Sequence, residues 1–202
     1  MQVSKIQFSK EELNLAGNAE WILTKNGIIA KVMSLFGELA DEYRSIVEKR
    51  IKWLPEQTAM YAPKISRGEQ YCGLPYVILD YPRIFSKEDV FAVRTMFWWG
   101  NYFSLTLHLK GEYKNAMQDS IVRQVDFFSA NEFLIAISEN EWQHDVSGEE
   151  YVSVRSSEIL VKERLVENKF VKLTRTWSLE QANQLSGLLA NEFSKLLKVI
   201  TT

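Results

Sequence analysis

The segment from Tyr71 to Lys110 constrains the fold most, because it holds the densest run of aromatic and β-branched residues in the chain. Within it, two strand-like runs, 90–99 and 102–109, are separated only by Gly100 and Asn101. Glycine at the first central position suits a two-residue type II′ turn. The sequence therefore predicts a tight β-hairpin.

The turn sets the register of this hairpin, and the register decides which side chains share a face. A two-residue loop pairs Trp99 with Tyr102 and Arg94 with Leu107. One face would then be apolar apart from Arg94, with Ala92, Met96, Trp98, Phe103, Leu105, Leu107 and Leu109. The other would be mixed, with Phe91, Val93, Phe97, Trp99, Tyr102, Ser104, Thr106 and His108.

That register places the charged side chain of Arg94 on an apolar face, where an unpaired guanidinium would be unfavourable. We therefore predict a carboxylate partner, with Asp80 on the preceding strand as the candidate. That strand, 74–81, is apolar almost without alternation, as expected of an interior strand. Pro75 marks its start and Pro82 its end. Arg94 is then either part of a structural ion pair or a bidentate clamp for an anion.

Amphipathic patterns predict helices at both ends of the chain. Ser9 and Glu12 form a capping-box pattern for a short helix, 10–16. A second helical piece begins at Ala19, and from Ile28 apolar residues recur at steps of three and four, at Ile29, Val32, Phe36, Leu39, Tyr43 and Ile46. Near the C-terminus, a capping box at Ser178 opens another helix.

The remaining elements are less regular in sequence. Residues 56–70 contain Pro63 and Gly68 and predict an irregular connection. After the hairpin we expect a helix over 113–130, a strand over 133–138, a short strand over 151–154, a helix over 157–168 and a strand over 170–177. This order favours one α+β domain, 1–202, whose mostly antiparallel sheet has a central hairpin and is covered by the N-terminal and C-terminal amphipathic helices.

Composition excludes several classes of protein. The chain is 46% hydrophobic and 25% charged with a net charge of −2, which is ordinary for a soluble domain and argues against a nucleic-acid partner. The single cysteine and the absence of an apolar signal region favour the cytoplasm. No run approaches the length of a membrane span, so no membrane partner is expected.

Signature motifs for phosphate cradling, dinucleotide binding, hydrolase nucleophiles and zinc proteolysis are absent, so no cofactor is predicted. Glu141 and His144 have the Glu-x-x-His spacing of di-metal sites, and Glu139 or Asp145 could add oxygen ligands. A di-metal bundle needs two such motifs, and this chain has one. We therefore predict no metal and expect 139–150 to be an exposed acidic loop or strand extension.

Three segments together resemble a bacterial domain family of unknown function. They are GLPYVILDYPRIF at 73–85, FWWGNYFSLTLHL at 97–109 and FVKLTRTWSLEQ at 170–181. The resemblance spans most of the chain but implies no activity, cofactor or catalytic residue.

Three functions remain open. The first is binding of a small anionic or aromatic ligand, or of a protein partner, through an aromatic-rich sheet face. Its tentative site residues are Asp80, Tyr81, Arg83, Arg94, Trp99, Tyr102 and His108. The second is an enzyme whose site is built from Asp80, Arg83, Arg94 and His108. The third is a homodimer in which the aromatic residues cover the interface.

Overall fold

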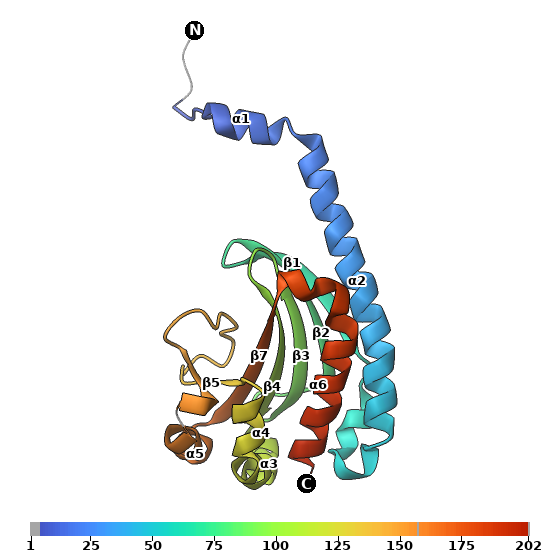
Figure 1. Cartoon of the computed structure of the whole chain (residues 1–202), viewed down its shortest axis with the longest axis vertical. Helices are drawn as coiled ribbons and strands as arrows, with labels where there is room; N and C mark the ends of the chain where they lie inside the picture. The colour runs from blue at the N-terminus through green and yellow to red at the C-terminus, as the bar shows by residue number, and fades with distance from the viewer. Residues whose placement is uncertain (1–4, 157, 202) are drawn as a thin grey trace.

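A seven-stranded antiparallel sheet forms the centre of the fold in the computed structural model, which describes residues 5–156 and 158–201 (Figure 1). The strands are β1 (Lys64–Tyr71), β2 (Leu74–Phe85), β3 (Val90–Trp98), β4 (Tyr102–Lys110), β5 (Leu134–Ala136), β6 (Tyr151–Ser153) and β7 (Phe170–Ser178). Their order in the sheet is β1–β2–β3–β4–β7–β5–β6. The predicted α+β class is confirmed. Residues 1–4, part of the stretch inspected for a signal region, and Ser157, the predicted start of a helix, lie outside the described residues.

Helices precede, interrupt and follow the strands. The α-helices are α1 (Lys10–Ala16), α2 (Ala19–Glu48), α3 (Gly111–Arg123), α4 (Val125–Ala130), α5 (Glu158–Glu167) and α6 (Leu185–Ile200). The 3-10 helices are η1 (Ile51–Trp53), η2 (Glu56–Met60), η3 (Val154–Ser156) and η4 (Leu179–Gln184). Both predicted capping boxes form, although the one at Ser178 opens η4 and not α6 itself. None of the described helices is long and apolar enough to cross a membrane.

Helices α2 and α6 lie side by side against one face of the sheet (Figure 1). Phe36 and Tyr43 of α2 and Phe193 of α6 are fully buried there. The Tyr43 ring stacks on Phe193 with centroids 3.8 Å apart, and its hydroxyl lies 3.0 Å from Thr95 Oγ1 on β3. Burying each such side chain contributes about 1.5–3 kcal/mol, so this face carries the main apolar core.

The β3–β4 hairpin is real, but its predicted register is wrong by one residue. Trp98 pairs with Tyr102, and Arg94 pairs with Thr106 and not with Leu107. The loop has three residues, with Gly100 in the left-handed region at φ 73° and the Asn101 N–H donating to the Trp98 carbonyl at 3.1 Å. Three-residue hairpin loops with one left-handed residue are a common alternative to the two-residue turn.

The one-residue shift moves every β3 side chain to the other set of β4 neighbours. The helix-facing side now holds Phe91, Val93, Thr95, Phe97, Phe103, Leu105, Leu107 and Leu109. The opposite side holds Ala92, Arg94, Met96, Trp98, Tyr102, Ser104, Thr106 and His108. The observed register buries Phe91, Val93 and Phe97 together with the apolar residues of β4 under the helices, which favours it over the predicted one.

The connection predicted over 56–70 is also wrong, because it contains η2 and the edge strand β1. This strand is polar and pairs with β2 mainly through its backbone, so it lacks an apolar signal. At Gly68 the Tyr76 ring comes so close that a Cβ atom would lie 2.6 Å from it, which explains the glycine.

Three further boundaries differ from prediction. Strand β2 continues past Pro82 to Phe85, because the register shifts between Asp80 and Arg83 and places the proline in the irregularity. The predicted helix over 113–130 is divided into α3 and α4 at Gln124. The strand predicted over 133–138 is only Leu134–Ala136.

Candidate functional site

The face of the sheet opposite α2 and α6 carries polar side chains in rows that cross the strands. Residues paired across neighbouring strands share a face. One row consists of Lys64, Asp80, Arg94, Thr106 and Thr174, and the next contains Ala92, His108 and Lys172. The predicted register would have put Arg94 and His108 on opposite faces, whereas the observed one brings them together.

Arg94 forms the predicted ion pair with Asp80. Its Nε donates to Oδ1 at 2.7 Å and its Nη2 donates to Oδ2 at 2.9 Å. Its Nη1 lies 2.8 Å from Nε2 of His144. The pair is well shielded, with side chains 17% and 10% exposed. The predicted partner, Asp80, is confirmed. The predicted apolar surroundings of Arg94 are not, because Thr106 and His108 lie on the same face.

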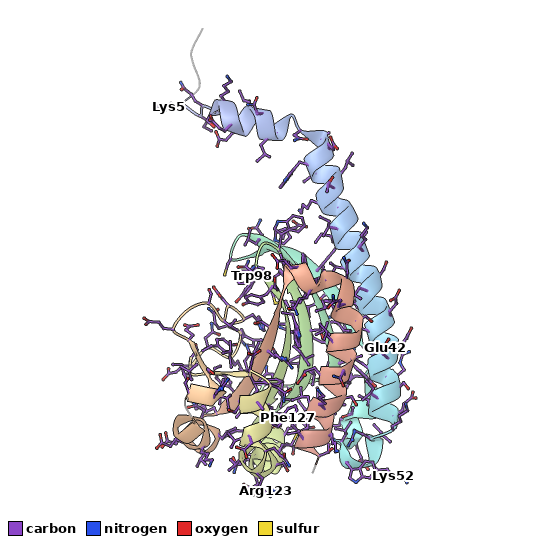
Figure 2. The ribbon with its side chains drawn as sticks, viewed as in Figure 1. Lys5, Glu42, Lys52, Trp98, Arg123 and Phe127 are labelled. Atoms are coloured by element: carbon purple, nitrogen blue, oxygen red, sulfur yellow. The ribbon has the colours of Figure 1, made fainter. Side chains whose placement is uncertain are left out.

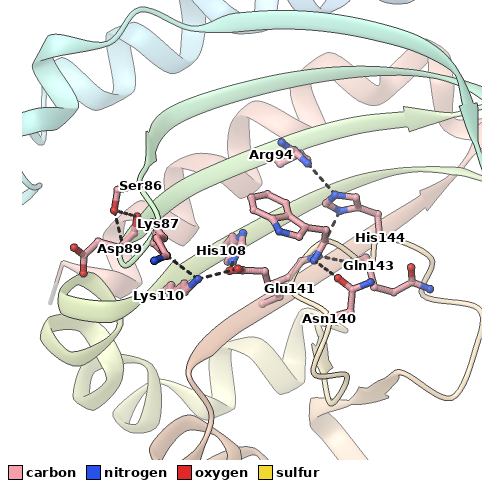
Figure 3. Close-up of polar contacts among 12 residues, drawn as sticks. Ser86, Lys87, Asp89, Arg94, His108, Lys110, Asn140, Glu141, Gln143 and His144 are labelled. Atoms are coloured by element: carbon pink, nitrogen blue, oxygen red, sulfur yellow. Dashed lines mark hydrogen bonds and ion pairs between the residues drawn. The ribbon is translucent and has the colours of Figure 1, made fainter.

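Residues 137–150, between β5 and β6, fold over this polar face (Figure 3). Tyrosine hydroxyls hold the backbone of this covering loop. Tyr71 accepts from the N–H groups of residues 144 and 145 at 2.8 and 2.9 Å. Tyr102 donates to the carbonyl of residue 144 and accepts from the N–H of residue 146, both at 3.0 Å. Tyr151 donates to the carbonyl of residue 143 at 2.8 Å. The expected exposed loop is therefore half-buried in its middle.

Lys172, in the middle of β7, is fully buried beneath the covering loop. Its Nζ donates to the carbonyl of Gln143 and lies 3.4 Å from Nδ1 of His144. Burial, assisted by the nearby charge of Arg94, lowers the pKa of Lys172 to about 7. The amine is thus held inside the fold and not offered to a substrate.

His144 sits between Arg94 and Lys172, and Figure 3 shows its contact with Arg94. Burial is the main cause that lowers its pKa to about 2, and Lys172 and Arg94 add to the shift. Because a guanidinium can only donate, Nε2 of His144 accepts from Arg94 and the ring proton lies on Nδ1, so that the 3.4 Å contact with Lys172 is a hydrogen bond only when the Lys172 amine is neutral and accepts it. The imidazole is therefore neutral and serves as a link between the covering loop and the sheet.

Glu141 connects the loop to β4. Its Oε1 accepts from Lys110 Nζ at 2.8 Å, and its Oε2 lies 3.3 Å from Nε2 of His108. Burial lowers the pKa of His108 to about 3, and the nearby cations Lys172, Arg94 and Lys110 add to the shift. The facing Nε2 and Oε2 atoms are buried, and neither makes a well-aligned hydrogen bond to another described residue.

The Glu-x-x-His pattern does not create a shared ligand set. Glu141 faces His108 and Lys110, while His144 faces Arg94 and Lys172. Over residues 5–156 and 158–201, no group of three or more histidine, cysteine, aspartate or glutamate residues is placed to hold a metal ion. The absence of tight metal binding remains a prediction.

A cavity of about 290 Å³ opens at the edge of the covering loop. We call it the basic pocket; its lining residues are Lys64, Ser66, Asp80, Arg83, Phe85, Arg94 and Trp142. Asp80, its one carboxylate, is engaged by Arg94. Phe85 and Trp142 form an aromatic wall with ring centroids 6.2 Å apart.

Two cations in the basic pocket retain unused donors. Arg83 donates from Nε to the Ala62 carbonyl at 2.7 Å and lies 5.3 Å from the Tyr61 ring centroid. Neither terminal nitrogen of Arg83, nor the Lys64 ammonium, has a hydrogen bond to another residue in the part of the chain that the structure describes. These groups can donate hydrogen bonds to an anion without giving up an existing hydrogen bond.

The seven residues predicted for a site do not all meet. Asp80, Arg83, Arg94, Tyr102 and His108 lie on the loop-covered face. Tyr81 is instead buried in the core under α2, and Trp99 packs on Phe97 at the helix-covered side. Tyr81 directly follows Asp80 and therefore reaches the opposite face by strand alternation, whereas the irregularity after Asp80 brings Arg83 onto the Asp80 face. The three-residue hairpin loop separates Trp99 from the face that holds Tyr102.

Sequence reasoning missed Lys64, Trp142, His144 and Lys172 as members of this region. One signal was available for Lys172, since a lysine flanked by Val171 and Leu173 in a buried strand needs an internal partner. Trp142 and His144 had no such signal, because their positions depend on how the covering loop folds. Comparison of the chain with protein-family models, with curated proteins and with solved structures finds no match.

Proposed function

We propose that this protein binds a small anionic compound with a planar or aromatic part in the basic pocket. The observation that carries the proposal is the pair of unengaged donors on Lys64 and Arg83 beside the Phe85–Trp142 wall. The volume of about 290 Å³ lies near the lower end of the range for ligand sites, about 300–1,000 Å³, and so suits a small molecule.

Charge supports the anionic part of the proposal. Lys64, Arg83 and Arg94 surround the pocket, and the single carboxylate among its lining residues is already neutralised by Arg94. An incoming carboxylate or phosphate would therefore meet an excess of positive charge, and the Arg83 fork can bind it with two parallel hydrogen bonds.

The aromatic wall supports the planar part. Phe85 and Trp142 are 40% and 50% exposed, so their ring faces are open to a ligand. Trp142 is also braced from behind by His108, whose ring centroid is 5.7 Å away. A planar group can stack here while its charge reaches Arg83.

No observation favours the enzyme alternative over binding. Asp80, Arg83 and Arg94 line the basic pocket, but His108 lies behind Trp142 and does not line it. The Asp80 carboxylate is engaged by both Nε and Nη2 of Arg94, which leaves it poorly placed as a general base.

The test is calorimetric titration with phenyl phosphate, inorganic phosphate and benzamide. We expect phenyl phosphate to bind more tightly than phosphate, and the neutral benzamide not to bind. Arg83→Gln should weaken phenyl phosphate binding about tenfold or more, because a charge-assisted hydrogen bond contributes about 1.5–3 kcal/mol. Trp142→Ala should reduce the preference for phenyl phosphate over phosphate.

Lys87→Gln is the matched control, because Lys87 is an exposed cation that does not line the basic pocket. It should leave the affinity unchanged. Binding that is equally strong in wild type, Arg83→Gln and Lys64→Gln would overturn the proposed site, and no binding of any anion would overturn the function.

A further inference from the structure

The N-terminal arm, residues 5–28, extends well beyond the sheet (Figure 1). Figure 2 shows its side chains, starting at Lys5, pointing into open space on several sides. Its exposed large apolar residues are Ile6, Phe8, Leu13, Leu15, Trp21, Ile22, Leu23 and Ile28, each between 38% and 75% exposed. Monomeric proteins rarely leave so many large apolar side chains together in water.

The apolar stripe of α2 continues into the arm, where the Lys25–Glu69 ion pair contacts β1 but Ile22 lies partly exposed. Ile22 is seven residues before Ile29, so the two lie on the same side of the helix. Ile29 is buried against the body, whereas Ile22 is 42% exposed. The apolar stripe that packs on the sheet is thus longer than the surface it covers.

The short helix α1 also lacks packing. It has seven residues and none of them is buried. An isolated helix shorter than about 12–15 residues is marginal in water, even with a good capping box. A contact from outside this chain would stabilise it.

An apolar groove of about 590 Å³ lies at the base of the arm. Its walls include Ile28 and Leu35 of α2, Phe97, Trp99 and Phe103 of the hairpin, and Leu179 of η4. Lys31 is the single charged residue among those that line it, and it has no ion-pair partner within the described residues. The β3–β4 loop, whose residues line the groove, lies at the end of the sheet from which the arm extends (Figure 1).

We propose that two copies of this chain form a dimer by reciprocal exchange, in which the arm of each copy packs into the apolar groove of the other. One chain carries both the donor surface and the acceptor surface, so a two-fold arrangement uses both and closes without further subunits. Apart from Ile28, which lines the groove itself, the seven exposed side chains of the arm offer on the order of 100 Å² each, about 700 Å² for each copy, close to the ~800 Å² for each partner of a stable interface.

The charge of the arm fits this partner better than a lipid surface. Lys25 is paired with Glu69, which leaves Lys5 and Lys10 against Glu11, Glu12 and Glu20, a net charge of −1. Helices that bind anionic membranes are rich in lysine and arginine on their polar side. The acidic arm is instead complementary to Lys31 at the groove of the second copy.

The test is sedimentation velocity of the full chain over about a hundredfold range of concentration. Wild type should dimerise. The arm variant Leu15→Glu/Trp21→Glu and the groove variant Leu35→Glu should each weaken the dimer about a hundredfold or more, because both place charges in the buried centre of the interface. Trp53→Glu, an equally drastic change at an exposed tryptophan outside the arm and groove, should have no effect.

Mixing the two variants separates this proposal from other interfaces. A mixed dimer retains one intact arm and one intact groove, so the mixture should dimerise more strongly than either variant alone. No recovery on mixing would contradict the arm-in-groove contact. A wild-type chain that is monomeric throughout, or a monomer that sediments with phosphatidylcholine vesicles, would overturn the dimer.

Discussion

The two faces of the sheet are covered in opposite ways. On one face, α2 and α6 bury rings and aliphatic chains such as Phe36 and Leu107. On the other, the covering loop is held by tyrosine hydroxyls and by Lys172 and His144. The same strands supply both faces, because side chains alternate along them.

The two faces should respond differently to mutation. Apolar burial is non-directional and spreads over many contacts, so its loss lowers the stability of the whole fold. A buried polar network depends on each donor and acceptor and on the charge state of its members. We therefore expect mutations on the helix-covered face to act globally, and those on the loop-covered face to act locally and with pH.

The largest loss of stability should come from a substitution on the helix-covered face. Phe36→Ala removes a fully buried ring and should lower the free energy of unfolding by about 3–5 kcal/mol. Urea denaturation followed by circular dichroism measures it. Met60→Ala is the control, since Met60 is 74% exposed and lies outside the arm and the groove, and it should change little. A loss below about 1 kcal/mol for Phe36→Ala would show that this face is not the main core.

Lowering the pH should reduce the stability of the protein through the buried histidines of the loop-covered face. The pKa values of His108 and His144 are lowered by burial to about 3 and about 2, so the unfolded chain binds more protons than the folded one as pH falls below about 6.5. Stability should then fall by about 1.4 kcal/mol for each histidine between pH 7.5 and pH 5.5.

Unfolding by urea at several pH values tests this. The variant His108→Gln/His144→Gln should flatten the profile over the same window. An equally steep profile in that variant would assign the acid sensitivity to other groups.

An intermediate loss of stability is expected when the Asp80–Arg94 ion pair is broken. Asp80→Ala leaves the Arg94 guanidinium without its bidentate partner in a place that is 17% exposed, and should lower stability by about 2 kcal/mol. Asp41→Ala breaks the exposed Arg44–Asp41 pair and should lower it by less than about 1 kcal/mol. Equal effects of the two substitutions, measured by thermal unfolding, would contradict the shielding of the Asp80–Arg94 pair.

The helix-covered face was largely predictable from sequence. The three-four spacing around Phe36 depends on residues close in the chain, and such local patterns determine helices directly. The hairpin was also predictable in position. Its register was not, because the sequence Trp99-Gly100-Asn101 is compatible with a loop of two or of three residues.

The loop-covered face was predictable only where it depends on adjacent strands. Asp80 and Arg94 were paired correctly because they lie on consecutive strands. His144 contacts Arg94 from 50 residues away in sequence, through a loop whose conformation is set by tyrosines on other elements. No local pattern encodes such contacts, and β1 was missed for a similar reason, since a polar edge strand resembles a loop.

The substitutions with the smallest expected effect on stability distinguish the two faces most directly. Tyr102→Phe removes two hydrogen bonds to the covering loop, and Tyr43→Phe removes one to Thr95 beneath the helices. A net hydrogen bond contributes about 1 kcal/mol, and the freed loop groups can turn to water. Tyr102→Phe should therefore leave global unfolding almost unchanged and speed amide hydrogen exchange over residues 137–150 about fivefold.

Tyr43→Phe should instead lower global stability without a local change, because its hydroxyl and Thr95 are both sealed in the core. Hydrogen exchange with mass-spectrometric readout measures both variants in one experiment. Unchanged exchange over 137–150 in Tyr102→Phe would mean that the loop opens only when the whole fold does. In that case the basic pocket, which Trp142 of the same loop helps to line, would be a rigid site. Faster local exchange would mean that a ligand stacked on Trp142 also closes the loop, so that adding phenyl phosphate should slow the exchange again.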